Sequence, residues 1–164
     1  MTRHRFVRWL PHPPEHLFGI VSDVAEYGRF VPLCERAEVW DVREDGPVRR
    51  FRARLEIAYP RLGLREHFVS DVEADAEKLL VIARSREGAV KELENRWLFR
   101  PRRGGTDVHF ALEFRMASRL LQTVMDAAFD YAARKILKAF EQRADELARQ
   151  KVAQNPPTPR DTPA

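Results

Sequence analysis

The chain has 164 residues, enough for one domain whose core needs neither a disulfide nor a metal. Its one cysteine excludes an internal disulfide, and no apolar run approaches the about 18 residues of a membrane-spanning helix. The formal charge of +4 permits a nucleic-acid partner, but solvated arginines on strand surfaces explain it better. The basic N-terminus lacks the apolar stretch of a secretory signal, so we expect a cytoplasmic protein.

The N-terminal part of the chain predicts a strand followed by a helix. Residues 3–10 mix arginine with large apolar side chains, and a group of prolines ends this strand. Pro14 suits the first turn of a helix, and Gly28 is placed to end it. Apolar residues between them recur at spacings of three and four, typical of one helix face: Leu17, Ile20, Val21 and Val24.

The connection after this helix is unusually apolar. Residues 30–33 read Phe-Val-Pro-Leu, and Cys34 follows before any charge returns. Loops between a helix and a strand are usually polar. The segment therefore either plugs one end of a core or lines the mouth of a cavity for an apolar ligand, and the residues alone leave both interpretations open.

From residue 39 to residue 116 the sequence alternates between apolar and polar side chains, which is typical of half-buried strands. Turn sequences at residues 44–47, 87–88 and 103–105 separate the segments. Short connections make successive strands antiparallel neighbours. We expect a meander of six strands, extended to seven if the first strand joins an edge or closes the sheet.

After Ser118, a suitable N-cap, the pattern becomes helical to residue 150, which gives a helix of roughly 45 Å. The predicted domain therefore spans residues 1–150. Residues 151–164 are polar and rich in proline, and we expect a disordered tail there. The predicted fold class is α+β, with a curved antiparallel sheet around a long C-terminal helix and a short helical segment after the first strand.

A curved sheet wrapped around one helix often leaves an apolar gap, and such gaps are common ligand sites. Filling a core remains the more frequent role of large residues on an inward strand face. Two polar residues, Glu66 and Asn95, share the inward apolar faces. A buried carboxylate is costly when unpaired, so Glu66 either pairs with an arginine, lies near an opening or contacts a ligand's polar head.

Four segments together resemble a known family: LPHPPEHLFGIVSDVAEYGRFVPLCERAEV, LENRWLFRP, TDVHFALEFRMAS and AFEQRADEL. Their order and spacing, spread over residues 2–150, are similar to the coenzyme Q-binding branch of the START-like (polyketide cyclase/dehydrase) superfamily. The same branch includes the bacterial ribosome-association toxin. One departure is Leu33, where this branch often has tryptophan after the proline.

The resemblance implies a helix-grip fold with a hydrophobic tunnel that binds an isoprenoid quinone (ubiquinone-like) or a similar lipid. The implied role is a carrier that supports respiratory electron transport, with no catalytic residue, cofactor or metal. Contact with the inner face of the plasma membrane is an open extension of that role, and no DNA partner is expected. The expected ligand-binding residues are Phe30, Val31, Leu33, Phe51, Leu55, Ile57, Leu64, Glu66, Phe68, Asn95, Trp97, Phe110, Phe114, Val124 and Ala128.

A second function that the resemblance permits is binding to the large ribosomal subunit, which would block subunit association. Arginines on the polar strand faces would then form a basic patch on the convex side of the sheet. The candidate members of this patch are Arg49, Arg50, Arg52, Arg54, Arg100, Arg102 and Arg103.

A third interpretation is a cyclase- or dehydrase-type enzyme, which would need positioned acids and bases in the cavity. His67 and His109 fall on polar strand faces. Prolines between His12 and His16 place His12 outside the helix, which disfavours a shared metal. Cys34 has no sequence partner and suits a small apolar plug. The sequence therefore favours binding over catalysis.

Overall fold

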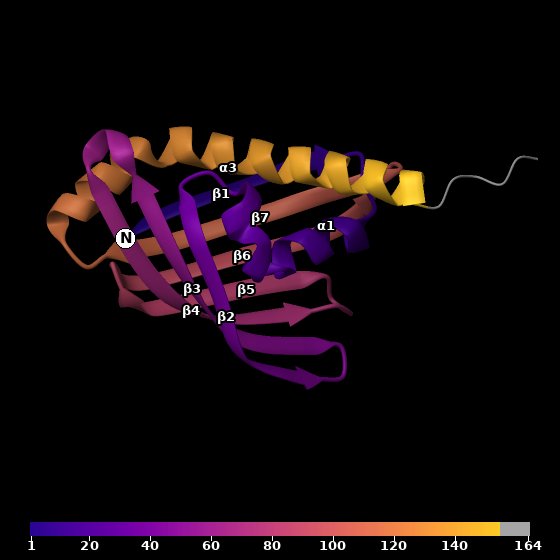
Figure 1. Ribbon diagram of the computed structural model, residues 1–164, viewed down its shortest axis with the longest axis horizontal. Helices are drawn as coiled ribbons and strands as arrows, with labels where there is room; N and C mark the ends of the chain where they lie inside the picture. The colour runs from indigo at the N-terminus through magenta and orange to yellow at the C-terminus, as the bar shows by residue number, and fades with distance from the viewer. Residues whose placement is uncertain (155–164) are drawn as a thin grey trace, which may run out of the picture.

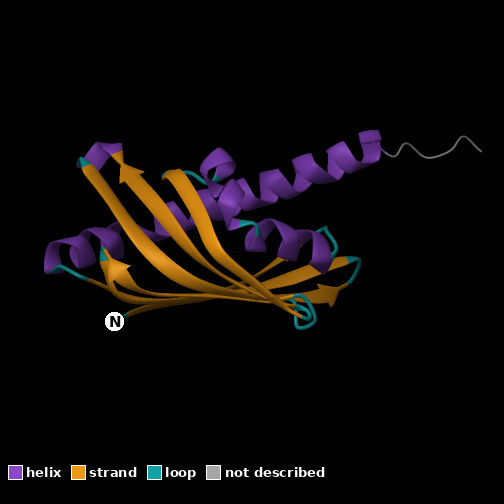
Figure 2. Ribbon diagram, turned by 60° about the horizontal axis from the view of Figure 1, so that its bottom comes forward, coloured by secondary structure: helices purple, strands orange, loops and turns teal. Residues whose placement is uncertain are grey.

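The computed structural model describes residues 1–154 as one curved sheet with helices on one side (Figures 1 and 2). The strands are β1 (Thr2–Leu10), β2 (Cys34–Asp45), β3 (Val48–Tyr59), β4 (Leu64–Asp75), β5 (Leu80–Gly88), β6 (Val90–Arg102) and β7 (Gly105–Met116). The helical elements are α1 (Pro14–Ser22), η1 (Val24–Glu26), α2 (Tyr27–Phe30), η2 (Pro60–Leu62) and α3 (Arg119–Gln154).

The seven strands have the order β1-β7-β6-β5-β4-β3-β2, and every neighbouring pair is antiparallel. This order is the predicted meander with the first strand added beside β7. The predicted α+β class and the long helix across the sheet are confirmed, and Figure 2 shows α3 on the concave side. Among residues 1–154, no helix combines the length and apolar character needed to cross a bilayer.

Two helix boundaries differ from the prediction. The first helix ends at Ser22, because Asp23 leaves helical geometry with a ψ of 67° and the chain continues through η1 and α2. The last helix has 36 residues and reaches Gln154, so residues 151–154 of the predicted tail are helical. The rest of that predicted tail, residues 155–164, lies outside the described residues.

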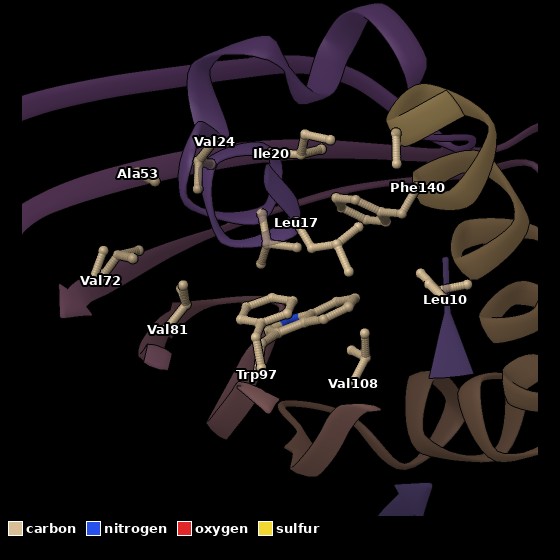
Figure 3. Packing of buried hydrophobic residues seen from close by; sticks show 14 of the residues in the cluster. Leu10, Leu17, Ile20, Val24, Ala53, Val72, Val81, Trp97, Val108 and Phe140 are labelled. Atoms are coloured by element: carbon tan, nitrogen blue, oxygen red, sulfur yellow. The ribbon is translucent and has the colours of Figure 1, made fainter. Parts of the chain in front are cut away.

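The core lies on the concave face, where α1 covers one half of the sheet. Figure 3 shows Leu17 and Ile20 of α1 near Phe140 of α3 and Trp97 of β6. The start of α1 is fixed to the C-terminal half of α3 by two histidines. His12 Nε2 lies 2.7 Å from Asp145 Oδ1, and His16 Nε2 lies 2.9 Å from the Ala144 carbonyl oxygen.

Ion pairs, set by the strand register, cover the convex face. Arg52 pairs with Asp71 at 3.1 Å and with Glu87 at 2.7 Å. Further pairs are Arg50–Glu73, Arg54–Glu56, Arg84–Glu94 and Arg102–Asp107. The predicted basic patch is therefore largely neutralised. Its proposed member Arg49 belongs to the other face, because it lies opposite Ala74 and its guanidinium carbon is 5.5 Å from the ring centre of Phe51.

Candidate ligand-binding site

The predicted ligand-binding residues divide into two groups by burial. Phe51, Trp97 and Phe114 are 4%, 7% and 2% exposed and belong to the filled interior. The other twelve are half-buried: Phe30, Val31, Leu33, Leu55, Ile57, Leu64, Glu66, Phe68, Asn95, Phe110, Val124 and Ala128. Partly accessible apolar side chains on the concave face are what an unfilled ligand site requires.

A continuous group of half-buried side chains lies on β3 and β4. Leu55 is directly opposite Phe68, and Ile57 is directly opposite Glu66, so all four project from the same face of the sheet. Leu64 continues this face at the start of β4. We call Leu55, Ile57, Leu64, Glu66 and Phe68 the half-buried wall.

Glu66 is the polar member of this wall, and both Arg65, its neighbour in sequence, and Arg54 of the adjacent strand are engaged elsewhere. Arg54 pairs with Glu56 at 3.5 Å, and Arg65 donates to Glu35 at 3.1 Å. Within residues 1–154, Glu66 has neither an ion pair nor a side-chain hydrogen bond. The first of the three alternatives for Glu66, an arginine pair, is therefore not found among these residues, and the carboxylate is available to a ligand.

Asn95 is the second inward polar residue, and it is already partly satisfied. Its side-chain amide donates to the Ala111 carbonyl at 3.0 Å, and its oxygen accepts the Trp97 indole N–H at 2.7 Å. One amide hydrogen and one lone pair of Asn95 remain for a ligand. The Trp97 ring is also fixed by Phe110, whose ring centre is 4.9 Å away in an edge-on arrangement.

Val124 and Ala128 lie apart from the wall, on the N-terminal part of α3. This part of the helix is fixed to the β1–β7 side of the sheet, where Thr2 donates a hydrogen bond to Asp126 at 2.5 Å. Phe129 adds a ring that stacks over Phe114 with centres 5.9 Å apart. The structure thus brings together the β3–β4 wall, while the two helical candidates face β1 and β7.

The apolar segment 30–33 is a fixed turn between α2 and β2. The Phe30 ring packs edge-on against Phe140 at 5.1 Å. The Leu33 carbonyl accepts a hydrogen bond from the Ala58 amide at 2.9 Å, next to Ile57 of the wall. Phe30 and Val31 also line a groove of about 510 Å³ between α2 and α3. The segment therefore covers one end of the core, and its outer side borders this surface groove.

The half of the concave face beneath α1 has little empty space. A gap there, lined by Leu17, Trp97, Phe99 and Phe140 among others, measures about 20 Å³, room for about one water molecule. A larger cleft of about 330 Å³ lies between α1 and the C-terminal part of α3, with Asp23, Glu26 and Arg143 in its lining. Burial, followed by the charge of Glu26, raises the pKa of Asp23 above its ordinary value.

Sequence reasoning missed several inward polar residues, among them His4 on β1. His4 lies opposite Leu112 on the concave face, and its ring stacks on Phe129 with centres 3.5 Å apart. Its Nε2 atom is buried and has no hydrogen-bond partner within residues 1–154. The signal was present in the alternation of Thr2, His4 and Phe6 with arginines.

The other titratable candidates have structural surroundings. His67 is exposed and His109 lies opposite Val7 on the convex face, as predicted. His12 precedes α1 and contacts Asp145, and residues 1–154 contain no cluster of three or more metal-ligating side chains. Burial raises the pKa of the Cys34 thiol, which makes it a poor nucleophile at neutral pH.

Comparison with known proteins connects this geometry to one family. The sequence model described as "Polyketide cyclase / dehydrase and lipid transport" matches residues 10–141. The chain is 28% identical to the ribosome association toxin RatA of Rickettsia prowazekii over 150 residues, 90% of this chain and 99% of that protein. It is 30% identical to the mitochondrial coenzyme Q-binding protein coq10 of Schizosaccharomyces pombe over 143 residues, 86% of this chain and 85% of that protein.

Solved structures agree with the sequence relatives. The 18 kDa protein CC1736 of Caulobacter crescentus has a TM-score of 0.77 and 35% identity, covering 90% of this chain and 99% of that one. The Zhui aromatase/cyclase of a Streptomyces species has a TM-score of 0.74 at 14% identity, covering 88% and 93%, a likeness of fold alone. The predicted resemblance is confirmed: the chain belongs to the polyketide cyclase / dehydrase and lipid transport family and has its START-like helix-grip fold.

Proposed function

We propose that this protein binds an isoprenoid quinone, or a similar prenyl lipid, along the half-buried wall and carries it in support of respiratory electron transport. The observation that carries the proposal is the wall itself, where apolar Leu55, Ile57 and Phe68 remain partly accessible on the concave face. The name of the fission-yeast relative, a coenzyme Q-binding protein, supports the quinone class.

A prenyl tail gains about 0.8 kcal/mol per buried CH₂, but a bilayer offers the same gain. Extraction from a membrane therefore needs additional contacts to the polar ring. The free amide hydrogen of Asn95, which lies on β6 outside the wall, suits the carbonyl oxygen of a quinone ring held at that end of the concave face, opposite Ala83. The Glu66 carboxylate accepts only from a donor, so it suits the hydroxyl of a reduced quinol.

Carriage without catalysis is part of this proposal. Two groups that hydrolytic or elimination chemistry would use have structural tasks: His12 contacts Asp145, and Cys34 is buried with a raised thiol pKa. The fold likeness to an aromatase/cyclase shows that the scaffold accommodates catalysis in another protein. In this chain, the accessible polar groups on the concave side are better suited to holding a ring than to breaking bonds.

Binding to the large ribosomal subunit is the alternative, supported by the name of the Rickettsia relative. Its expected surface was the basic convex face, where Arg50, Arg52 and Arg54 each pair with a carboxylate. These pairs reduce the attraction of that face for phosphate. The lipid-carrier function is therefore the one that the geometry supports better.

The test is organic extraction and mass spectrometry of the purified protein from a quinone-producing host. We expect a prenyl quinone to co-purify with the wild type and with the Val42→Glu variant, which is a control at an exposed position of β2. The Ile57→Glu variant, which places a charge in the wall, should contain no lipid after purification. Circular dichroism should show that this variant is folded. A lipid-free wild type that also refuses added quinone would contradict the proposal, and salt-dependent sedimentation with the large ribosomal subunit would then support the alternative.

A further inference from the structure

We propose that the groove between α2 and α3, together with the adjoining turn η2, is a docking surface for an anionic phospholipid membrane. The inference deepens the proposed function and rests on it, because it assigns the place where the carrier meets the bilayer. We call this the docking surface and define it by its apolar and cationic members: Phe30, Val31, Pro32, Leu62, Tyr131, Arg61, Lys135 and Lys138.

The cationic half of the docking surface lies on α3. Lys135 and Lys138 are three residues apart, so they project from the same face of the helix, and both line the groove of about 510 Å³. Both lysines are exposed, and neither has an ion pair within the part of the chain that the structure describes. Arg29 also lines the groove but is paired with Glu26 at 3.1 Å. Among the described residues, no carboxylate lines the groove, so its charge complements an anionic partner.

The apolar half flanks these lysines. Phe30, Val31 and Pro32 form the wall of the groove on the α2 side. On α3, Tyr131 is 44% exposed, and the Lys135 ammonium nitrogen lies 4.6 Å from the centre of its ring. Tyrosine beside lysine is the pairing that membrane interfaces favour, because the ring lies among headgroups while the cation meets phosphate.

The turn η2 brings a third element to this surface. Leu62 at its end is 50% exposed, and Arg61 lies beside it. A hydrogen bond from Lys135 together with its charge and, to a smaller extent, the charge of Arg61 lower the pKa of the Tyr131 hydroxyl. Figures 1 and 2 show η2 and α2 on the side of the sheet that α3 covers.

The docking surface lies next to one end of the half-buried wall. The turn η2 joins β3 to β4, directly beyond Ile57 and Glu66. Segment 30–33 is hydrogen-bonded to β3 at Ala58, beside the same Ile57. A bilayer that meets both segments would therefore lie at the mouth of the proposed lipid site. The apolar residues favour a membrane over RNA, whose backbone would leave the exposed Leu62 and the half-buried Val31 without a partner.

The experiment compares two charge-matched double variants with the full-length wild type. Lys135→Glu/Lys138→Glu reverses the groove lysines, and Lys78→Glu/Lys91→Glu reverses two exposed lysines outside the groove. Binding is measured by co-sedimentation with phosphatidylcholine vesicles, with and without about 30% phosphatidylglycerol. Circular dichroism and thermal unfolding confirm that each variant is folded.

We expect the wild type and the Lys78/Lys91 variant to bind the anionic vesicles alike. The Lys135/Lys138 variant should bind them at least about tenfold more weakly, and about 0.5 M salt should weaken the wild type in the same way. Equal binding by both variants, or no preference of the wild type for anionic vesicles, would overturn the docking surface. Loss of ribosome binding with unchanged vesicle binding in the Lys135/Lys138 variant would also overturn it, in favour of a nucleic-acid surface.

A soluble short-tailed quinone separates this inference from the proposed function. The Lys135/Lys138 variant should bind it as the wild type does, whereas Ile57→Glu should lose it and still bind anionic vesicles. A wild type that binds vesicles through the groove lysines but takes up no quinone refutes the carrier function and leaves the docking surface supported.

Discussion

The two halves of the concave face have the same kind of sequence but different burial. Beneath α1, Phe99 and Val72 are 2% and 4% exposed. At the other end of the same sheet, Leu55 and Phe68 are only half-buried, although they continue the same inward rows. Alternation therefore determines which face a residue occupies, and the helices above that face determine whether it becomes core or ligand wall.

This contrast gives each half its own task. The half beneath α1 is closed by apolar packing and by the two histidine contacts to α3. The half-buried wall has no such cover from α1, which contacts β5 and β6. We infer that stability is concentrated in the first half and ligand binding in the second.

The largest expected difference is in stability. Phe99→Ala should lower the free energy of unfolding by about 3–5 kcal/mol, because it leaves a cavity in a filled region. Phe68→Ala should cost less than half as much, because part of its surface is already accessible. Urea unfolding of both variants measures the difference. Equal losses would show that the two halves are packed alike.

A smaller effect is expected at Asn95, whose side-chain oxygen accepts a hydrogen bond from Trp97 of the closed half. Asn95→Leu leaves the buried Trp97 indole N–H without its acceptor, which should cost about 1–3 kcal/mol. Trp97→Phe removes that donor, so the double variant should recover part of the Asn95→Leu loss. The cycle is measured by urea unfolding. If the losses of unfolding free energy in the two single variants add up to the loss in the double variant, the hydrogen bond contributes nothing to the stability of this region.

At Glu66 the expected effect is on ligand binding alone. Glu66→Gln should leave the free energy of unfolding nearly unchanged, since the carboxylate has no partner within the described residues. It should weaken binding of a short-tailed quinol by about tenfold and affect the oxidised quinone less. Fluorescence titration of both redox forms checks this. Equal effects on the two forms would remove Glu66 from the ring-binding role.

The smallest effect is expected at low pH, at the junction of β1 with α3. The Thr2 hydroxyl donates to Asp126 and holds the pKa of that carboxyl below its ordinary value. A carboxyl with a lowered folded-state pKa adds stability above its unfolded pKa of about 3.9, and this is lost as the pH falls through the folded value. Thr2→Ala should therefore raise the Asp126 pKa, which an NMR titration measures. An unchanged pKa would exclude this hydrogen bond.

Much of the fold could be predicted from local patterns. Alternation placed Phe51 and Leu55 on the apolar face of one strand and Glu66 on the apolar face of the next, and the change to helical spacing after Ser118 located the long helix. The break at Asp23 could not be predicted, because apolar spacing continues through Val24. Its cause is a backbone turn that lets α2 reach α3, a tertiary requirement that helix periodicity does not encode.

The site was only partly predictable, because burial and pairing depend on register. The arginines of β3 looked like a basic patch until β4 and β5 placed Asp71 and Glu87 beside Arg52. In the same way, an arginine pair was one alternative for Glu66, and the structure excludes Arg54 and Arg65 because they pair with Glu56 and Glu35. These outcomes depend on which residues lie opposite each other, and a single strand sequence does not contain that information.

The most direct test of the central claim is methyl NMR of the protein with a short-tailed quinone. The account predicts chemical-shift changes and intermolecular contacts at the methyl groups of Leu55 and Ile57 in the half-buried wall. The methyl groups of Val72 and Val81 beneath α1, which are 4% and 3% exposed, should change little. Changes confined to Val72 and Val81, or to exposed Val7 and Val42 elsewhere on the sheet, would contradict it.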